Sequence, residues 1–355
     1  MTKRWRLSGQ TDTGMRRRSI LSALHLRSGS GLLLLAWAVL TSAADGPQEW
    51  LNRMAAATQN VSYEGTLVHT CDGVVDVVQI VHRVDDGHVT QRITSHDPAG
   101  REIIRNPDEV MCVLPEQSSV VVEKQLHRSQ REESPISKMP SFANVNTAIY
   151  KLAMLRPEQI AGRETEVIAV RPLDEYRYGY RLWLDRVKAM ALKFELLGET
   201  GDALEQISFE EIEYSDNIPA VNVGPTMPMD TFTRQQSVVS VDSPPGLYAS
   251  GAETVRWQAT ELPAGFILAV RRSKTLSGSG RPVEQLVYSD GLGSVSVFIE
   301  SGVAEEEQAE GLSRFGATNA YTTTMEDRLI TAVGYVPIRT VKMIALSVRP
   351  VRESP

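Results

Sequence analysis

Three side chains in the first third of the chain are of types that bind metal ions. His69 and Cys71 are two residues apart in an alternating stretch and therefore share one face of a predicted strand, and His82 could lie across the next hairpin. Imidazole and thiolate groups are common zinc ligands. However, the sequence has no CxxC, HExxH or carboxylate cluster beside them. We favour ordinary strand residues and expect no metal and no cofactor.

The sequence offers little for catalysis. Acid pairs such as Glu210-Glu211 and Asp85-Asp86 fall at predicted strand ends or turns, where solvated charge is a better interpretation than acid–base work. The chain has 6 histidines and none follows His127, so no histidine in its C-terminal part could activate a serine. No nucleophile elbow, P-loop or dinucleotide fingerprint is present. We predict that the protein is not an enzyme.

Basic residues are too few to indicate a nucleic-acid partner. Arg271-Arg272, and Arg177 with Arg181, could hold phosphate or carboxylate groups, but solvated strand positions are the simpler interpretation. The formal net charge is -7. Without residues 1–44 the chain has 30 basic and 43 acidic residues, a net charge of -13. Such a surface repels nucleic acid and anionic membranes.

The first 44 residues have the pattern of a secretory signal peptide. A basic Arg16-Arg17-Arg18 precedes the apolar run GLLLLAWAVL, which is too short to span a bilayer, and Ser42-Ala43-Ala44 supplies small residues for cleavage. The alternative is an uncleaved N-terminal anchor. The pattern predicts an exported protein.

Two cysteines, Cys71 and Cys112, remain in the exported part. A pair of cysteines can form a disulfide in an oxidising compartment. Their predicted strands do not establish that the two Cα atoms come within bonding range. A disulfide and two separate thiols both stay open.

The longest clean strand pattern spans residues 176–214 and predicts an antiparallel meander. Its polar face, which includes Arg177 and Arg181, is expected to face solvent. Its apolar face is either a closed core under helices or an open groove for acyl chains or a partner segment, and we favour the groove. The candidate ligand-binding residues on this face are Tyr176, Tyr178, Tyr180, Leu182, Leu184, Leu192, Phe194 and Leu196.

The rest of the chain supports a mainly β protein with some α structure (α+β). A helix at residues 47–58 precedes a β meander, and residues 45–222 are expected to form a large domain. Residues 223–250 are rich in Pro, Gly and Ser and predict a linker, with a short helix at 231–237. Residues 251–352 predict a small antiparallel sheet and a C-terminal helix that Pro337 opens.

Several motifs, in order along nearly the whole exported chain, resemble the RseB/MucB family of periplasmic regulators. Each is weak alone and together they are specific. They are Tyr176-Arg177-Tyr178-Gly179-Tyr180 through Leu184-Asp185; Gly201 with Leu204-Glu205-Gln206; Trp257 with Leu262-Pro263-Ala264-Gly265-Phe266; Tyr288-Ser289-Asp290-Gly291-Leu292 with Ser296-Val297-Phe298; and Val333-Gly334-Tyr335-Val336-Pro337.

The resemblance implies a large domain similar to lipoprotein carriers of the LolA type, an unclosed β-barrel wrapped around helices. It implies that the small domain engages the periplasmic part of a membrane anti-sigma factor of the RseA or MucA type. Family members shield that factor from proteolysis, which keeps the envelope-stress sigma factor inactive until lipid or lipopolysaccharide releases it. For the partner site we expect Trp257, Phe266, Tyr288, Asp290 and Leu292, although burial in the core is the alternative for the three aromatic residues.

Two functions therefore compete. The first is a periplasmic binding regulator, with a lipid ligand as the signal and homo-oligomerisation left open. The second is a periplasmic carrier of lipids or lipoproteins, which would transfer its cargo between membranes. The extra domain at residues 251–352 favours the regulator.

Overall fold

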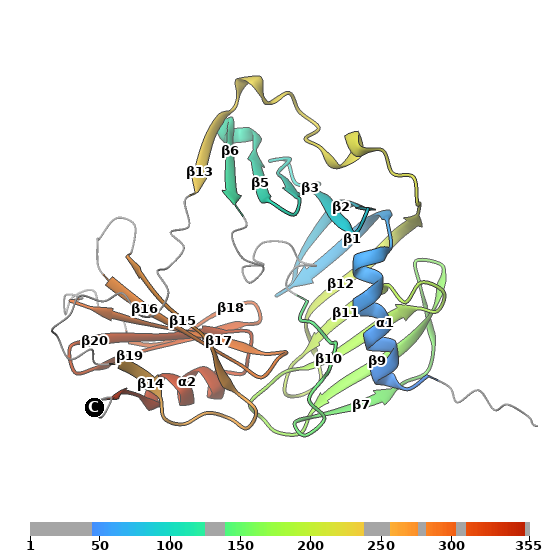
Figure 1. The fold of residues 1–355 in the computed structure, drawn as a ribbon. Helices are drawn as coiled ribbons and strands as arrows, with labels where there is room; N and C mark the ends of the chain where they lie inside the picture. The colour runs from blue at the N-terminus through green and yellow to red at the C-terminus, as the bar shows by residue number, and fades with distance from the viewer. Residues whose placement is uncertain (1–44, 125–138, 238–255, 276–281, 303–309, 352–355) are drawn as a thin grey trace, which may run out of the picture. The chain divides into compact units, whose positions relative to one another are not determined.

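The computed structural model of the protein describes residues 45–124, 139–237, 256–275, 282–302 and 310–351. The predicted signal peptide and residues 238–250 of the predicted linker lie outside the described residues. The remainder is mainly β with few helices, arranged as one large open, mostly antiparallel sheet and a smaller sheet with a C-terminal helix, which confirms the predicted fold class (Figure 1).

The first half of the large sheet is a meander with Asp-Gly turns. The residues of the turns at Asp72-Gly73 and Asp86-Gly87 all have positive φ, as the type I′ hairpin requires. A 3-10 helix, η1 (Pro115–Gln117), joins the last two strands. The strands are β1 (Tyr63–Cys71), β2 (Val74–Asp85), β3 (His88–Ser95), β4 (Glu102–Arg105), β5 (Glu109–Leu114) and β6 (Ser119–Lys124).

The second half is a second meander. Its strands are β7 (Tyr150–Met154), β8 (Glu158–Ile160), β9 (Arg163–Pro172), β10 (Gly179–Asp185), β11 (Ala191–Leu197) and β12 (Ala203–Tyr214). The two meanders join because β1 pairs antiparallel with β12, from Tyr63 opposite Tyr214 to Cys71 opposite Glu205. The resulting sheet runs β13-β6-β5-β4-β3-β2-β1-β12-β11-β10-β9-β7, with β8 on β9.

The predicted linker begins with regular structure. Two 3-10 helices, η3 (Ala220–Val223) and η4 (Met229–Thr231), lead into β13 (Thr233–Ser237), which pairs parallel with β6. The prediction of a short helix at residues 231–237 is therefore wrong. A short polar segment has little local preference, and the edge of β6 offers it a ladder of hydrogen bonds.

One helix covers the apolar face of the large sheet. α1 (Pro47–Asn60) begins with Pro47, which has no N–H to leave unsatisfied in the first turn. Its buried residues Trp50, Leu51, Met54 and Ala57 recur at helical spacing and join the core formed by β1, β2 and β9–β12. Figure 1 shows α1 lying along these strands. The predicted helix at residues 47–58 is confirmed.

The smaller sheet has six strands in the order β15-β16-β17-β20-β19-β18. They are β15 (Ile267–Thr275), β16 (Pro282–Ser289), β17 (Ser294–Ser301), β18 (Gly311–Phe315), β19 (Thr318–Met325) and β20 (Arg328–Gly334). The sequence did not predict β18, because its described side chains are all exposed and give no alternating signal.

The C-terminal helix packs against this sheet. α2 (Ile338–Ser347) follows Pro337, and its buried Val341, Ile344 and Ala345 join the core of the small sheet. A two-stranded ribbon of β14 (Arg256–Ala259) and β21 (Val348–Val351) completes this region. Among the described residues, no helix is long and apolar enough to span a bilayer.

Candidate functional site

The two sheets belong to one unit of the chain, residues 45–355, and meet at a short segment before β10. Arg177, in this segment, is only 2% exposed. Its Nε and Nη2 donate to the two carboxylate oxygens of Asp174 at 2.9 and 2.8 Å. Nη1 donates to Asp290 Oδ2 at 2.6 Å, and Nη2 also donates to the carbonyl of Ala264 at 2.7 Å. A guanidinium presents several donors in a fixed plane, so one side chain can join these groups.

Asp290 is the counterpart of Arg177 in the small sheet. It lies in the turn between β16 and β17, where its Oδ1 accepts the backbone N–H groups of Leu292 at 2.9 Å and Gly293 at 2.7 Å. Its Oδ2 also accepts the hydroxyl of Tyr150 at 3.0 Å. Burial, as the largest cause, raises the pKa of Tyr150, so its hydroxyl keeps the proton that it donates. The turn therefore holds its carboxylate in place for Arg177.

Further hydrogen bonds surround this ion pair. The hydroxyl of Thr340, in α2, donates to the carbonyl of Tyr176 at 2.6 Å. The amide of Asn319, in β19, donates to the hydroxyl of Tyr178 at 2.9 Å and to the carbonyl of Val336 at 2.8 Å. We call residues 174–178 the docking segment, because Tyr176, Arg177 and Tyr178 join this part of the large sheet to Thr340 of α2 and to Asp290 and Asn319 of the small sheet.

The docking segment corrects two expectations from the sequence. β10 begins at Gly179, so Tyr176 and Arg177 precede the strand instead of alternating within it. Arg177, expected to face solvent, is buried because Asp290 and Asp174 replace its hydration. Arg181, the other expected solvent-facing arginine, has a side chain 37% exposed and pairs with Glu195 at 3.2 Å.

The predicted ligand-binding residues form the interior of the large sheet. Tyr176 is half-buried and lies in the docking segment, and the other seven are buried in the core with α1 and Phe142. Leu292 and Tyr335 of the small sheet pack against the same core. A small cavity of about 30 Å³ remains between them and Tyr180, Phe194 and Ile207. The apolar face is thus covered, and its role in ligand binding stays a prediction.

The predicted partner-binding residues divide into two groups. Phe266, Asp290 and Leu292 lie at the junction: the Arg177 guanidinium lies 5.5 Å from the centre of the Phe266 ring. Trp257 and Tyr288 instead lie in the core of the small sheet, 5% and 2% exposed. The Tyr288 hydroxyl there accepts the backbone N–H of Ala259 at 2.7 Å. Leu292, predicted to bind the partner, therefore packs against the core that contains the predicted ligand-binding residues.

The metal-type residues near the start of the chain also separate. His69 Nε2 lies 2.7 Å from Glu205 Oε1, and Cys71 faces Glu205 across the β1–β12 pair. His82 lies elsewhere: it stacks on Tyr63 with ring centroids 4.8 Å apart and accepts a hydrogen bond from Gln91 at 3.0 Å. Glu205 completes a group that short-range spacing could not reveal.

The two cysteines are not joined by a disulfide. β1 and β5, which contain Cys71 and Cys112, are separated by β2, β3 and β4 in the sheet. Neighbouring strands are about 4.8 Å apart, so this separation far exceeds the span of a disulfide.

Sequence reasoning missed the residues that complete the junction. Asp174, Tyr150, Asn319 and Thr340 lie in different elements and form no local motif. Asp174 is only three residues from Arg177. Tertiary pairing alone brings Tyr150, Asn319 and Thr340 to this segment, so an arginine flanked by tyrosines, with an aspartate three residues before it, was the available sequence signal.

Two family models match this chain, the MucB/RseB N-terminal domain over residues 46–227 and the MucB/RseB C-terminal domain over residues 251–349. The chain belongs to the MucB/RseB family. A curated relative, the sigma factor AlgU regulatory protein MucB of Pseudomonas aeruginosa, is 31% identical over 332 residues, which cover 92% of this chain and 98% of that protein.

Solved MucB/RseB structures agree with this assignment. MucB in complex with MucA(peri) matches 86% of this chain and 98% of its own, with a TM-score of 0.63 and 27% identity. The Pseudomonas aeruginosa MucA/MucB complex gives a TM-score of 0.64 and 28% identity over the same shares. The resemblance read from the tyrosine-rich segment and the other motifs is confirmed.

Proposed function

We propose that this protein is a periplasmic negative regulator that binds the periplasmic segment of a membrane anti-sigma factor of the MucA or RseA type. By covering that segment it protects the anti-sigma factor from regulated proteolysis, and the envelope-stress sigma factor stays inactive. The observation that carries the proposal is the match over 86% of the chain to MucB solved together with the periplasmic part of MucA. The predicted signal peptide supports the periplasmic location.

The test uses the mature protein, residues 45–355, and the periplasmic segment of the cognate anti-sigma factor. Calorimetry should detect a complex between them. Cleavage of the segment by the site-1 protease should slow as the mature protein is added, because a bound segment is not available to the protease. Absence of a complex, or cleavage at an unchanged rate in the presence of a complex, would contradict the binding or the protective part of the proposal, respectively.

We further propose that a lipid, such as the acyl chains of lipopolysaccharide, ends this protection by entering the apolar interior of the large sheet. Leu292 and Tyr335 now cover the side chains of Tyr180, Phe194 and Leu196, and the remaining cavity is smaller than an acyl chain. A lipid that occupies this interior must displace both side chains. Because they belong to the small sheet, its occupancy would bias the arrangement of the two sheets.

Addition of lipopolysaccharide to the preformed complex should release the anti-sigma segment. The matched variants are Leu292→Ala, which opens the cover and should lower the lipid concentration needed for release, and Leu312→Ala, an exposed leucine of β18 that should leave it unchanged. Equal responses of the two variants would exclude this entry point.

The competing carrier function makes a different prediction. A carrier would take lipid from one membrane and deliver it to another, whereas the regulator binds lipid without transfer. Vesicles with labelled lipid distinguish the two, and rapid vesicle-to-vesicle transfer by the mature protein would favour the carrier.

A further inference from the structure

Three metal-binding types of side chain converge where β1 meets β12. The donor atoms of His69, Cys71 and Glu205 all lie within 4.8 Å of one another. His69 and Cys71 point to the same face of β1, and Glu205 lies opposite Cys71 on β12. This face continues into the core through Leu67 and Ile207, so an apolar floor closes one side of the group.

We propose that His69, Cys71 and Glu205 bind a divalent transition-metal ion of the zinc type. A thiolate, an imidazole nitrogen and a carboxylate oxygen are the three ligand classes that Zn²⁺ uses in proteins, and three such ligands leave a fourth position for water or another group. Mg²⁺ and Ca²⁺ prefer oxygen ligands, so the thiol and the imidazole select against them. Metal binding here does not require the proposed regulatory function, although Glu205 also borders the cavity beneath Leu292 and Tyr335.

The surroundings of His69 suit this role. Its Nδ1 lies 3.7 Å from Asp76 Oδ2, while its Nε2 points to Glu205. With the ring proton on Nδ1, toward Asp76, the Nε2 lone pair faces the other two donors. The 3.7 Å separation is longer than a hydrogen bond, so the exposed Asp76 side chain must move closer to accept this proton; a carboxylate in that place fixes the tautomer and ring orientation of a metal-bound imidazole. Asp76 is therefore a positioning residue of the site.

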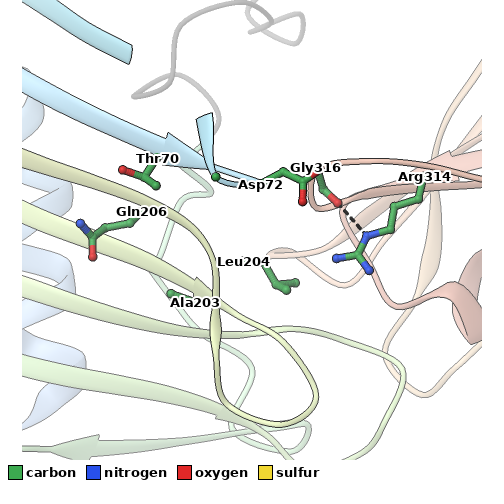
Figure 2. A pocket seen from close by; sticks show the side chains of 8 residues that line it. Thr70, Asp72, Ala203, Leu204, Gln206, Arg314 and Gly316 are labelled. Carbon is green, nitrogen blue, oxygen red and sulfur yellow. Dashed lines mark hydrogen bonds between the residues drawn. The ribbon is translucent and has the colours of Figure 1, made fainter. Parts of the chain in front are cut away.

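A turn of the small sheet borders the site. A Cβ atom placed on Gly316, between β18 and β19, would lie 2.7 Å from Cys71 Sγ, and Gly316 has a φ of +57°. Only glycine allows the turn to approach the thiol this closely in that conformation. Figure 2 shows Gly316 and Arg314 beside the end of β1; the hollow of about 290 Å³ that they line also contacts Thr70 and Gln206, on the other face of the β1–β12 pair from Cys71 and Glu205.

Metal binding displaces at least one proton. The thiol of Cys71 becomes a thiolate, and its proton leaves to solvent. The imidazole must present an unprotonated Nε2 to the metal ion. Affinity should therefore fall as the pH decreases, and the binding heat should depend on the ionisation enthalpy of the buffer.

The test adds Zn²⁺ and, separately, Co²⁺ to the metal-free, reduced mature protein. Calorimetry should give one Zn²⁺ per chain, and Co²⁺ should produce the thiolate-to-metal charge-transfer absorption of a sulfur ligand. Cys71→Ser should abolish that absorption and weaken Zn²⁺ binding by at least about tenfold. Asp76→Asn, at a largely exposed residue, should weaken it by about 10–100-fold without touching a ligand.

Two variants control for the remaining thiol and for an exposed histidine. Cys112→Ser and His88→Gln should leave the stoichiometry, affinity and Co²⁺ spectrum unchanged. The proposal is overturned if the reduced protein binds no Zn²⁺, if the Co²⁺ complex lacks the thiolate absorption, or if Cys71→Ser binds as tightly as the unaltered chain.

Discussion

His82 shows how the environment of one residue sets the pH range in which the protein is stable. It lies in β2, is 4% exposed and stacks on Tyr63, its cross-strand neighbour in β1. Burial lowers the pKa of His82 from 6.5 to about 4. Between these values the unfolded chain binds the proton and the folded chain does not, so folding becomes less favourable as the pH falls.

We therefore expect the free energy of unfolding to lose about 3 kcal/mol through His82 as the pH falls from 6.5 to 4. The measurement is urea unfolding over this pH range for the mature protein and for His82→Gln, in which this part of the pH dependence should disappear. His88→Gln alters an exposed histidine of β3 and should leave the pH dependence of the unfolding free energy unchanged. Parallel stability curves for the unaltered protein and His82→Gln would contradict the expectation.

The ion pair between Arg177 and Asp290 makes a second prediction at the same scale. Their side chains are 1% and 0% exposed, so neutralising one leaves the other desolvated without its full partner. Asp290→Asn keeps the size of the side chain and should lower the free energy of unfolding by about 3 kcal/mol. Asp45→Asn, at an exposed ion pair with Arg53, should cost less than about 1 kcal/mol in the same assay. Similar losses for both would mean that the buried pair contributes little.

At the scale of the elements, β17 and β20 lie very close together at Gly334. A Cβ atom at this position would lie 2.2 Å from the carbonyl oxygen of Ser294 and 3.1 Å from Val295 Cα. Both neighbours are backbone atoms of β17, so no side-chain movement can relieve the overlap. The end of β20 therefore requires glycine even though its φ is ordinary.

Gly334→Ala should destabilise the small sheet by about 1–3 kcal/mol, the usual cost of overpacking. Chemical unfolding monitored by the fluorescence of Trp257, which lies in the same core, reports the change. Gly224→Ala is the control, because its nearest non-neighbouring atom would be 3.6 Å from the new Cβ. If Gly334→Ala is as stable as the control, the strands can separate at no cost.

The sequence was most informative where local chemistry decides the structure. Asp72-Gly73 and Asp86-Gly87 predict their hairpins because both residues of each pair tolerate positive φ, and Pro47 and Pro337 predict helix starts. The sequence did not predict features that depend on residues far apart in the chain. The pairing of β1 with β12, the burial of Arg177 and the approach of Glu205 to His69 all depend on contacts between remote segments.

At the scale of the whole molecule, the docking segment links the covered interior to the small sheet. The same contacts that hold Asp290 and Asn319 also keep Leu292 and Tyr335 over the core of the large sheet. Loosening the polar contacts should therefore expose apolar side chains that are not themselves altered.

The double variant Asp290→Asn/Asn319→Ala should speed amide hydrogen exchange in β11 and β12, whose Leu196 and Ile207 border the covered cavity. Exchange in β3 and β4, at the far part of the sheet, should stay as it is and serves as the internal control. Unchanged exchange in β11 and β12 would show that the two sheets stay together without these side chains.

The pairing of β1 with β12, in which Tyr63 lies opposite Tyr214, also determines the order in which the strands can fold. As the chain emerges from its N-terminus, β1 and β2 appear early and can form their hairpin at once. The other edge of β1 has no neighbour until β12 appears. Contacts between segments so far apart form slowly. For that interval the apolar residues of β1 and α1 have no finished sheet to cover them, which makes the newly made chain a natural client for holding chaperones.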